Sequence, residues 1–533
     1  MEKQKGLTAW YLTMMSLGTV IGGSFFLGTS VAIHAAGPSV IINYVLGGVL
    51  VYFILYALSE MTVANPGAGS FRAFAAQAFG PGTGFVVGWV YWSGMILAMS
   101  SEATAISILV RKWIPNLSLP LLGSLIIIGV TLLNLLGARQ LSKLESGLAA
   151  IKLITIVSFI IFALLMVIGL FPGARAAGIG ELAREPAMPG GLKGIAGSIL
   201  IVMFAYAGFE VIGLAASEAE NPRKTVPRAI RNTVLSLVSL YILTALAILP
   251  LVPTAALGEN MSPMVAALTR QGVTWAGTAL NAVLITAILS TMLAAMFGLG
   301  RMIRSLADEG HAPVWLKDER EVPFRGILFS GFAMLAGLGL GLLLPRVYLF
   351  LISSGGFALL FTYAAIMATQ LRYRKRFGCP PEGKCQMPGY PYTTWAVLTV
   401  LVIAMLSMPF IPGQASGLFA GVALVVLFTA IYTVMRFRAK YPGRAPIAGS
   451  ILKPGSAFRP GNAFKPGSAP KPGNRPGFST EASRELTNKP EAYEKQVEQT
   501  ERSEHTEKTR SSETAEAAEA TETAEQKDDQ SGY

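Results

Sequence analysis

Twelve apolar stretches follow one another along the first 440 residues of the chain, and each is near the length of about 20 residues that crosses a bilayer as a helix. In lipid, only α-helices and closed β-barrels pair all their backbone groups. The apolar runs are continuous and do not alternate with polar residues, which favours helices over a barrel. The sequence therefore predicts an all-α integral membrane protein with about twelve transmembrane helices, expected at 10–34, 38–60, 84–110, 119–137, 146–170, 194–217, 228–251, 274–299, 325–344, 347–369, 392–411 and 416–436.

Basic residues between the apolar stretches predict the orientation. With the N-terminus inside, the inner connections and the segment after the last span carry 23 Lys and Arg residues, and the outer connections carry 7. Because cytoplasmic loops are enriched in Lys and Arg, both termini are expected in the cytoplasm. The compact loops suggest a bacterial plasma membrane, and the short polar start of the chain shows no signal-peptide cleavage pattern.

Composition narrows the function classes. Of 533 residues, 52% are hydrophobic and only 14% charged, where a soluble domain carries about 25% charged residues. The net charge of +12 lies mostly in loops, so it indicates orientation and not nucleic-acid binding. Two cysteines and three histidines form no metal or catalytic cluster, and no phosphate-binding loop is present. We expect no enzyme activity, no cofactor, no metal and no ATP-driven pump.

The segment 441–533 differs from the preceding core, 1–440. It begins with four Lys/Arg-Pro-Gly-Ser/Asn repeats at six-residue spacing, and after Ser479 it is rich in Glu, Thr, Ala and Lys. Pro and Gly at this density interrupt helices and strands, and the segment has too little apolar mass to offset its ordering entropy. The sequence predicts a disordered cytoplasmic tail.

Glycine clusters interrupt the first and sixth apolar stretches. Residues 18–28 read GTVIGGSFFLG, and residues 204–210 read FAYAGFE. Interrupted helices at matching places in two halves of a transporter mark a midplane binding site, and a spacing of five spans suits two inverted repeats of five helices. Half-helix N–H groups suit a carboxylate, and freed carbonyls suit an ammonium, so an α-amino acid fits both. Close helix packing is the alternative use of such glycines.

Four motifs resemble amino acid permeases of the amino acid–polyamine–organocation superfamily. They are 18–28, the span 6 run that continues as ASEAENPRKTVPRAI at 216–230, RMIRSLADEGHAP at 301–313 and PGAGSF at 66–71. The resemblance covers residues 10 to about 440 and implies a 5+5 inverted repeat with broken helices 1 and 6, two extra helices and alternating access.

The same resemblance implies the substrate-binding residues. Those facing the substrate carboxylate would be Ile21, Gly22, Gly23 and Ser24. Those offering carbonyls to the amine would be Phe204, Ala205, Tyr206 and Ala207, with Phe204 as an aromatic gate. The chain departs from the family's pattern at Ser24, where glycine is usual, and at 293–295, where Leu-Ala-Ala replaces an Asn-Ser-Gly run.

Three ionisable residues lie inside predicted spans, where a charge is costly and marks a functional candidate. The resemblance implies that the ammonium of Lys152 takes the place that sodium occupies between spans 1 and 8 of some relatives, and that its charge couples proton binding to span 1. A lysine reaching to the membrane surface is the alternative. Glu102 would contact the amine, relay protons or bond a neighbouring helix. Glu210 would shuttle protons or fix the unwound segment. We expect Glu218 and Arg301 to form a gating or structural ion pair.

The leading hypothesis is secondary active transport of an amino acid, as a proton symporter. An amino acid/amine exchanger and an amino acid-sensing receptor are the alternatives. A neutral aliphatic or aromatic substrate is expected, with Phe204 and Met99 in the lining. The partners implied are an amino acid, protons and the lipid bilayer, and the sequence leaves the oligomeric state open.

Overall fold

The computed structural model describes residues 7–65, 70–136, 138–170, 178–210, 212, 219–320, 322–344, 346–378 and 387–440. Across these ranges the regular elements are helical, and the one extended pairing is an isolated bridge between Leu7 and Ala219. The expectation of an all-α fold is confirmed.

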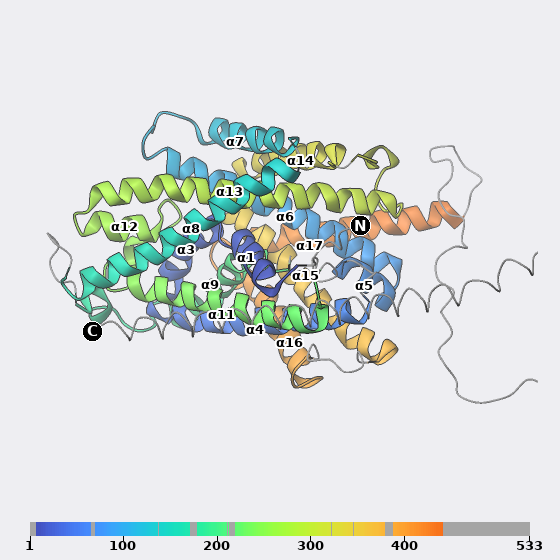
Figure 1. The fold of residues 1–533 in the computed structure, drawn as a ribbon, viewed down its shortest axis with the longest axis horizontal. Coiled ribbons are helices and arrows are strands. Elements are labelled where there is room, and N and C mark those ends of the chain that lie inside the picture. The colour runs from blue at the N-terminus through green and yellow to red at the C-terminus, as the bar shows by residue number, and fades with distance from the viewer. Residues whose placement is uncertain are drawn as a thin grey trace, which may run out of the picture. The chain divides into compact units, whose positions relative to one another are not determined.

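The helices follow one another as the apolar runs predict (Figure 1). In the first half they are α1 (Ala9–Val20), α2 (Gly23–Phe26), α3 (Gly28–Ala36), α4 (Val40–Ala64), α5 (Phe71–Phe79), α6 (Pro81–Val110), α7 (Leu119–Asn134), α8 (Ala138–Val167) and α9 (Gly191–Ala205). In the second half they are α11 (Pro222–Ile248), α12 (Pro263–Arg270), α13 (Thr274–Asp308), α14 (Phe324–Leu342), α15 (Val347–Phe377), α16 (Tyr392–Ser407) and α17 (Ala415–Lys440). Short 3-10 turns occupy Gly37–Ser39, Gly180–Ala183, Thr254–Ala256, Val314–Leu316 and Met408–Phe410.

Local sequence signals set several helix ends. Ser70 caps α5 by accepting a hydrogen bond from the Ala73 N–H at 3.3 Å. Gly80 then adopts φ +106°, a conformation that favours glycine, and Pro81 opens α6 at a first-turn position where its missing N–H costs nothing. The Gly-Pro pair therefore converts one helical run into two helices.

Nine helical segments in the described ranges are long and apolar enough to cross a membrane. One of them, Gly23–Ala64, runs through α2, α3 and α4, and therefore overlaps two of the expected spans. Expected spans four and six correspond to the shorter apolar helices α7 and α9. Each expected span overlaps a helix, and the number of twelve, like the inverted repeat, stays a prediction.

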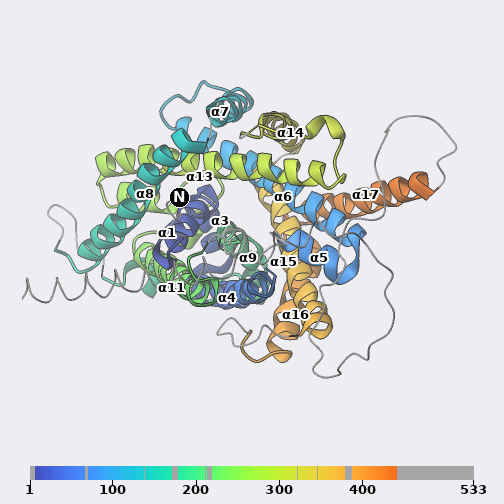
Figure 2. The ribbon, with the colours of Figure 1, turned by 45° about the vertical axis from the view of Figure 1, so that its right-hand side comes forward.

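The broken helices lie among other helices. Figures 1 and 2 place α1, α3 and α9 between α4 and α11 on one side and α8 and α13 on the other. Helix α13 contacts α6, α8 and α14, while α15 packs on α6, α16 and α17. The side chains of α1, α9 and their neighbours form one buried apolar core, within which the polar groups of the breaks must find partners.

Several predictions concern residues outside the described ranges. They include Glu218, the cysteine pair Cys379 and Cys385, the start of the PGAGSF motif and the tail 441–533. Arg301 is described and lies exposed on α13, so its pairing with Glu218 stays a prediction.

Candidate functional site

The first helix breaks where the glycine pair predicts. Helix α1 ends at Val20, Gly22 is extended with φ −136° and ψ −159°, and α2 begins at Gly23. A Cβ on Gly23 would lie 2.5 Å from Oε2 of Glu102, and one on Gly22 would lie 3.1 Å from the Thr291 side chain. At both positions a Cβ would require a neighbouring side chain to shift, because side chains from α6 and α13 approach the backbone directly.

Glu102 of α6 occupies the N–H groups of this break. Its carboxylate accepts hydrogen bonds from the Gly23 N–H at 2.5 Å and the Ser24 N–H at 3.1 Å. The side chain is buried, with 3% of its surface exposed. The N–H groups expected to face a substrate carboxylate thus bind a carboxylate of the protein itself. The Ser24 hydroxyl, an added group relative to the usual glycine, lies buried beside it.

Gly23→Ala is expected to displace the Glu102 carboxylate, since the new methyl group would collide with it. Hydrogen bonds to charged groups contribute about 1.5–3 kcal/mol, so the free energy of unfolding should fall by about that amount and lower the melting temperature. Gly28→Ala is the control, because its Cβ would meet Ile201 at an ordinary 3.4 Å. Equal melting temperatures of the two variants would contradict the close approach.

Lys152 of α8 lies at the end of α1. Its Nζ donates to the Gly18 carbonyl at 2.7 Å, the Ile21 carbonyl at 3.1 Å and Oγ1 of Thr291 at 3.2 Å. No part of the residue is exposed. The ammonium is thus bound at the break of span 1 and does not extend to the membrane surface. Its oxygen ligands come from α1 and α13, which correspond to the spans 1 and 8 of the family resemblance.

Thr291 is a site residue that sequence reasoning missed. Its hydroxyl contacts Lys152 and donates a hydrogen bond to the Ile21 carbonyl at 3.0 Å. The Leu-Ala-Ala run at 293–295 departs from the family's pattern, but Thr291, two residues before this run, belongs to no motif. Hydroxyl side chains are common in membrane helices, and the sequence alone does not distinguish Thr291 from its neighbour Ser290.

The second break follows α9. Gly208 adopts φ +105°, and its Cβ would lie 3.1 Å from the Thr19 carbonyl oxygen. The Thr19 hydroxyl in turn donates to the Gly208 carbonyl at 3.4 Å. The two breaks therefore contact each other directly.

The carbonyls of the second break have internal donors. The Phe204 carbonyl accepts from the Ala207 N–H at 3.1 Å, and the Ala205 carbonyl accepts from the Tyr241 hydroxyl at 2.8 Å. The Tyr206 hydroxyl donates to the Tyr44 carbonyl at 2.9 Å. Phe204 is buried, with its ring beside Gly355 of α15, and its role as a gate stays a prediction.

Aromatic side chains pack around this break. The Tyr241 ring stacks on Phe25 with centroids 4.3 Å apart and on Tyr206 at 4.8 Å, while Tyr44 meets Tyr241 edge-on at 5.6 Å. No local pattern singled out Tyr44 or Tyr241, because aromatic residues are common in membrane helices. Met99, expected in the lining, is buried on α6.

Glu210 binds a separate set of partners. It accepts hydrogen bonds from the Tyr91 hydroxyl at 2.9 Å, the Tyr363 hydroxyl at 3.3 Å and the Gly208 N–H at 3.1 Å. These bonds join the segment after α9 to α6 and α15. Whether Glu210 shuttles protons or fixes this segment stays a prediction. Glu210 thus binds the backbone of the second break, whereas Glu102 and Lys152 each bind the backbone of the first.

A third buried acid, Glu60 of α4, was overlooked in the sequence. It accepts from Gln370 at 3.2 Å, Arg374 at 3.5 Å and the Met387 N–H at 2.9 Å. The intramembrane-charge rule that selected Glu102 would have found it at the end of the second apolar stretch. These contacts join α4 to α15 near the end of both helices.

The loop that contains Gly258 and Glu259 contacts the starts of α3 and α15. The Gly258 N–H donates to the Ser30 hydroxyl at 3.1 Å, and Glu259 pairs with Arg346 at 3.8 Å. Burial raises the pKa of Glu259, against the opposing effects of Arg346 and His34. The loop thus covers the end of α3 that continues from the first break.

Comparison with known proteins decides the family. A family model described as "Amino acid permease" matches residues 11–443. The chain belongs to the amino acid permease family. It is 33% identical over 454 residues to an uncharacterized amino acid permease, YtnA of Bacillus subtilis, covering 83% of this chain and 98% of that relative. It is 30% identical to the γ-aminobutyric acid permease of B. subtilis and 31% identical to that of Escherichia coli, covering 94% and 89% of those proteins.

This permease is therefore a multi-pass membrane transporter and not an enzyme, as the motifs implied. The segment matched by the family model contains both helix breaks. The alignment with YtnA covers 98% of that relative. Membership of a family of permeases supports amino acid transport over the hypothesis of an amino acid-sensing receptor.

Proposed function

We propose that this permease is an amino acid/proton symporter that works by alternating access, and that Glu102 carries the coupled proton. The observation that supports the proposal is the pair of hydrogen bonds from Gly23 and Ser24 to the Glu102 carboxylate. An amino acid carboxylate needs the same N–H groups. Two carboxylates on one pair of donors would repel each other, so only one can be bound as an anion.

Protonation resolves this competition. A neutral carboxylic acid is a weaker acceptor than a carboxylate, so protonated Glu102 releases the two N–H groups to the substrate. The Ile21, Gly22, Gly23 and Ser24 backbone would then bind the carboxylate. The amine would displace internal donors from the carbonyls of Phe204–Ala207. When Glu102 loses its proton on the inner side, it rebinds the N–H groups and expels the substrate.

Lys152 supplies a permanent counter-charge in this scheme. Its ammonium is fixed at the carbonyls that end α1, where it stabilises the ionised Glu102 and the closed break together. Glu210 is a second candidate for proton transfer, and its three donors fit a role in positioning the second break equally well.

The buried aromatic and small side chains around both breaks favour a neutral substrate, aliphatic or aromatic. Two relatives bear the name of γ-aminobutyric acid, whose amine lies farther from its carboxylate, so this compound belongs in the test panel.

The test is uptake into proteoliposomes of the twenty amino acids and γ-aminobutyric acid, with and without an inward proton gradient. Accumulation only with the gradient, accompanied by inward current for a neutral substrate, is the expected result. Uptake that requires internal amino acid and ignores the gradient would make the protein an exchanger and would refute proton coupling.

A further inference from the structure

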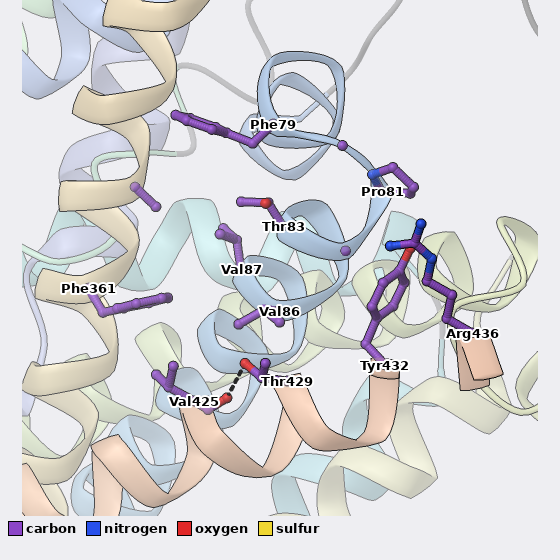
Figure 3. A pocket seen from close by; sticks show the side chains of 13 residues that line it. Phe79, Pro81, Thr83, Val86, Val87, Phe361, Val425, Thr429, Tyr432 and Arg436 are labelled. Atoms are coloured by element: carbon purple, nitrogen blue, oxygen red, sulfur yellow. Dashed lines mark hydrogen bonds between the residues drawn. The ribbon is translucent and has the colours of Figure 1, made fainter. Parts of the chain in front are cut away.

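A groove lies away from both helix breaks, between the start of α6, the middle of α15 and the second half of α17 (Figure 3). Its volume is about 640 Å³. None of its lining residues comes from α1, α2 or α9, so the groove is separate from the proposed transport site. Most of the lining is apolar, including Val86, Phe361 and Val425.

The walls of the groove belong to membrane helices. Helices α6, α15 and α17 are all long and apolar enough to cross a bilayer. Only 11% of the apolar window of α17 is buried, and large side chains such as Phe419, Val426 and Phe437 stand exposed along it. Because hydrocarbon is the solvent for such a helix, an occupant reaches the groove from the lipid phase.

One end of the groove is positively charged. Figure 3 shows Tyr432 and Arg436 extending from α17 toward Pro81 at the start of α6. Within the described part of the chain, Arg436 has no hydrogen-bond or ion-pair partner. The guanidinium of Arg372 lies 5.0 Å from the ring centre of Phe79, which lines the groove, and Arg376 donates to the Gln77 carbonyl beside it at 3.0 Å. Among the described residues, no acidic side chain lines the groove to neutralise these charges.

An apolar channel with basic residues at one end matches the two parts of an anionic phospholipid. Arginine binds phosphate oxygens through charge-assisted hydrogen bonds, and basic residues at a membrane surface attract anionic headgroups. We propose that the groove binds one anionic phospholipid, with an acyl chain along Val86, Phe361 and Val425 and the phosphate at Arg436. A zwitterionic lipid would fit the channel and gain less at the basic end, since its headgroup carries no net charge.

The experiment is native mass spectrometry of the full-length protein, taken from vesicles with equal amounts of phosphatidylglycerol and phosphatidylcholine. We expect one retained lipid per chain, enriched about fivefold in phosphatidylglycerol, as one basic residue near a membrane surface provides. Arg436→Gln should remove this enrichment. Arg228→Gln, which changes an exposed arginine of α11 remote from the groove, should keep it.

A second variant tests the channel itself. Ala365→Phe places a ring in the groove lining and should reduce retention of both lipids. Melting temperatures in phosphatidylcholine alone confirm that Arg436→Gln and Ala365→Phe fold. If Ala365→Phe unfolds, Val86→Phe replaces it as the channel variant. Equal retention of the two lipids by the unmodified protein, or unchanged enrichment in Arg436→Gln, would overturn the proposal. So would a dimer that Ala365→Phe dissociates without loss of lipid, because a second copy would then be the occupant.

Discussion

Glu102→Gln is expected to bind its amino acid with an affinity that no longer depends on pH. Glutamine keeps the shape of the protonated acid and cannot ionise, so it cannot compete as an anion for the Gly23 and Ser24 N–H groups. In the unmodified permease, substrate binding requires Glu102 to hold one proton. Above the pH at which Glu102 ionises, the affinity for the substrate should therefore fall about tenfold for each pH unit. Binding measured between pH 5 and pH 9 should therefore give a sloping line for the unmodified protein and a flat one for the variant.

Transport by Glu102→Gln should change in a matching way. Exchange of labelled for unlabelled substrate should continue, while accumulation driven by a proton gradient should stop. Glu210→Gln is the matched comparison, because it neutralises another buried carboxylate with three donors. If Glu210→Gln flattens the pH dependence and Glu102→Gln preserves it, the coupled proton resides at the second break and our assignment is wrong.

Lys152→Ala is expected to abolish accumulation driven by the proton gradient. A gradient of one pH unit supports about tenfold accumulation for one coupled proton, and the variant should only equilibrate its substrate. The physical reason is the loss of the ammonium from the carbonyls of Gly18 and Ile21, which leaves buried acceptors and the Glu102 carboxylate without a counter-charge. Uptake of labelled substrate with and without the gradient measures the effect.

The control for Lys152→Ala must separate coupling from folding. Unsatisfied buried carbonyls cost about 1–3 kcal/mol each, so a lowered melting temperature alone would not establish a role in coupling. Lys193→Ala removes an exposed lysine of α9 and should leave accumulation unchanged. A folded Lys152→Ala variant that accumulates substrate normally would remove Lys152 from the mechanism.

The positions of the helix breaks could be predicted from the sequence because glycines clustered inside an apolar run weaken the helix at that point. Lys152 was selected because it is an ionisable residue inside a predicted span, and its ammonium lies at the break of span 1. The contact of Glu102 with Gly23 and Ser24 could not be predicted, since it joins residues 79 and 78 positions apart through the packing of α6 on α2. Thr291 was missed for the same reason, because its importance lies in neighbours that no local pattern specifies.

Helix counting from hydrophobicity had a similar limit. The method marks apolar length, and it works for α13 or α15, whose runs are long and uninterrupted. It is weaker at α7 and α9, which are short. Around α9 the shortness is itself part of the site, because the helix ends where the carbonyls of the second break begin.

The carboxylate of Glu102 has a consequence for what the carrier excludes. A tethered group acts as a competitor whose effective concentration is fixed by the fold and does not change with the medium. A simple anion such as acetate offers one carboxylate and must displace Glu102 with nothing further to gain. A zwitterion brings an ammonium as well, and so has a second interaction with which to outcompete the tether. Glu102 would thus select against ligands that carry only a carboxylate and favour ligands that carry both a carboxylate and an ammonium.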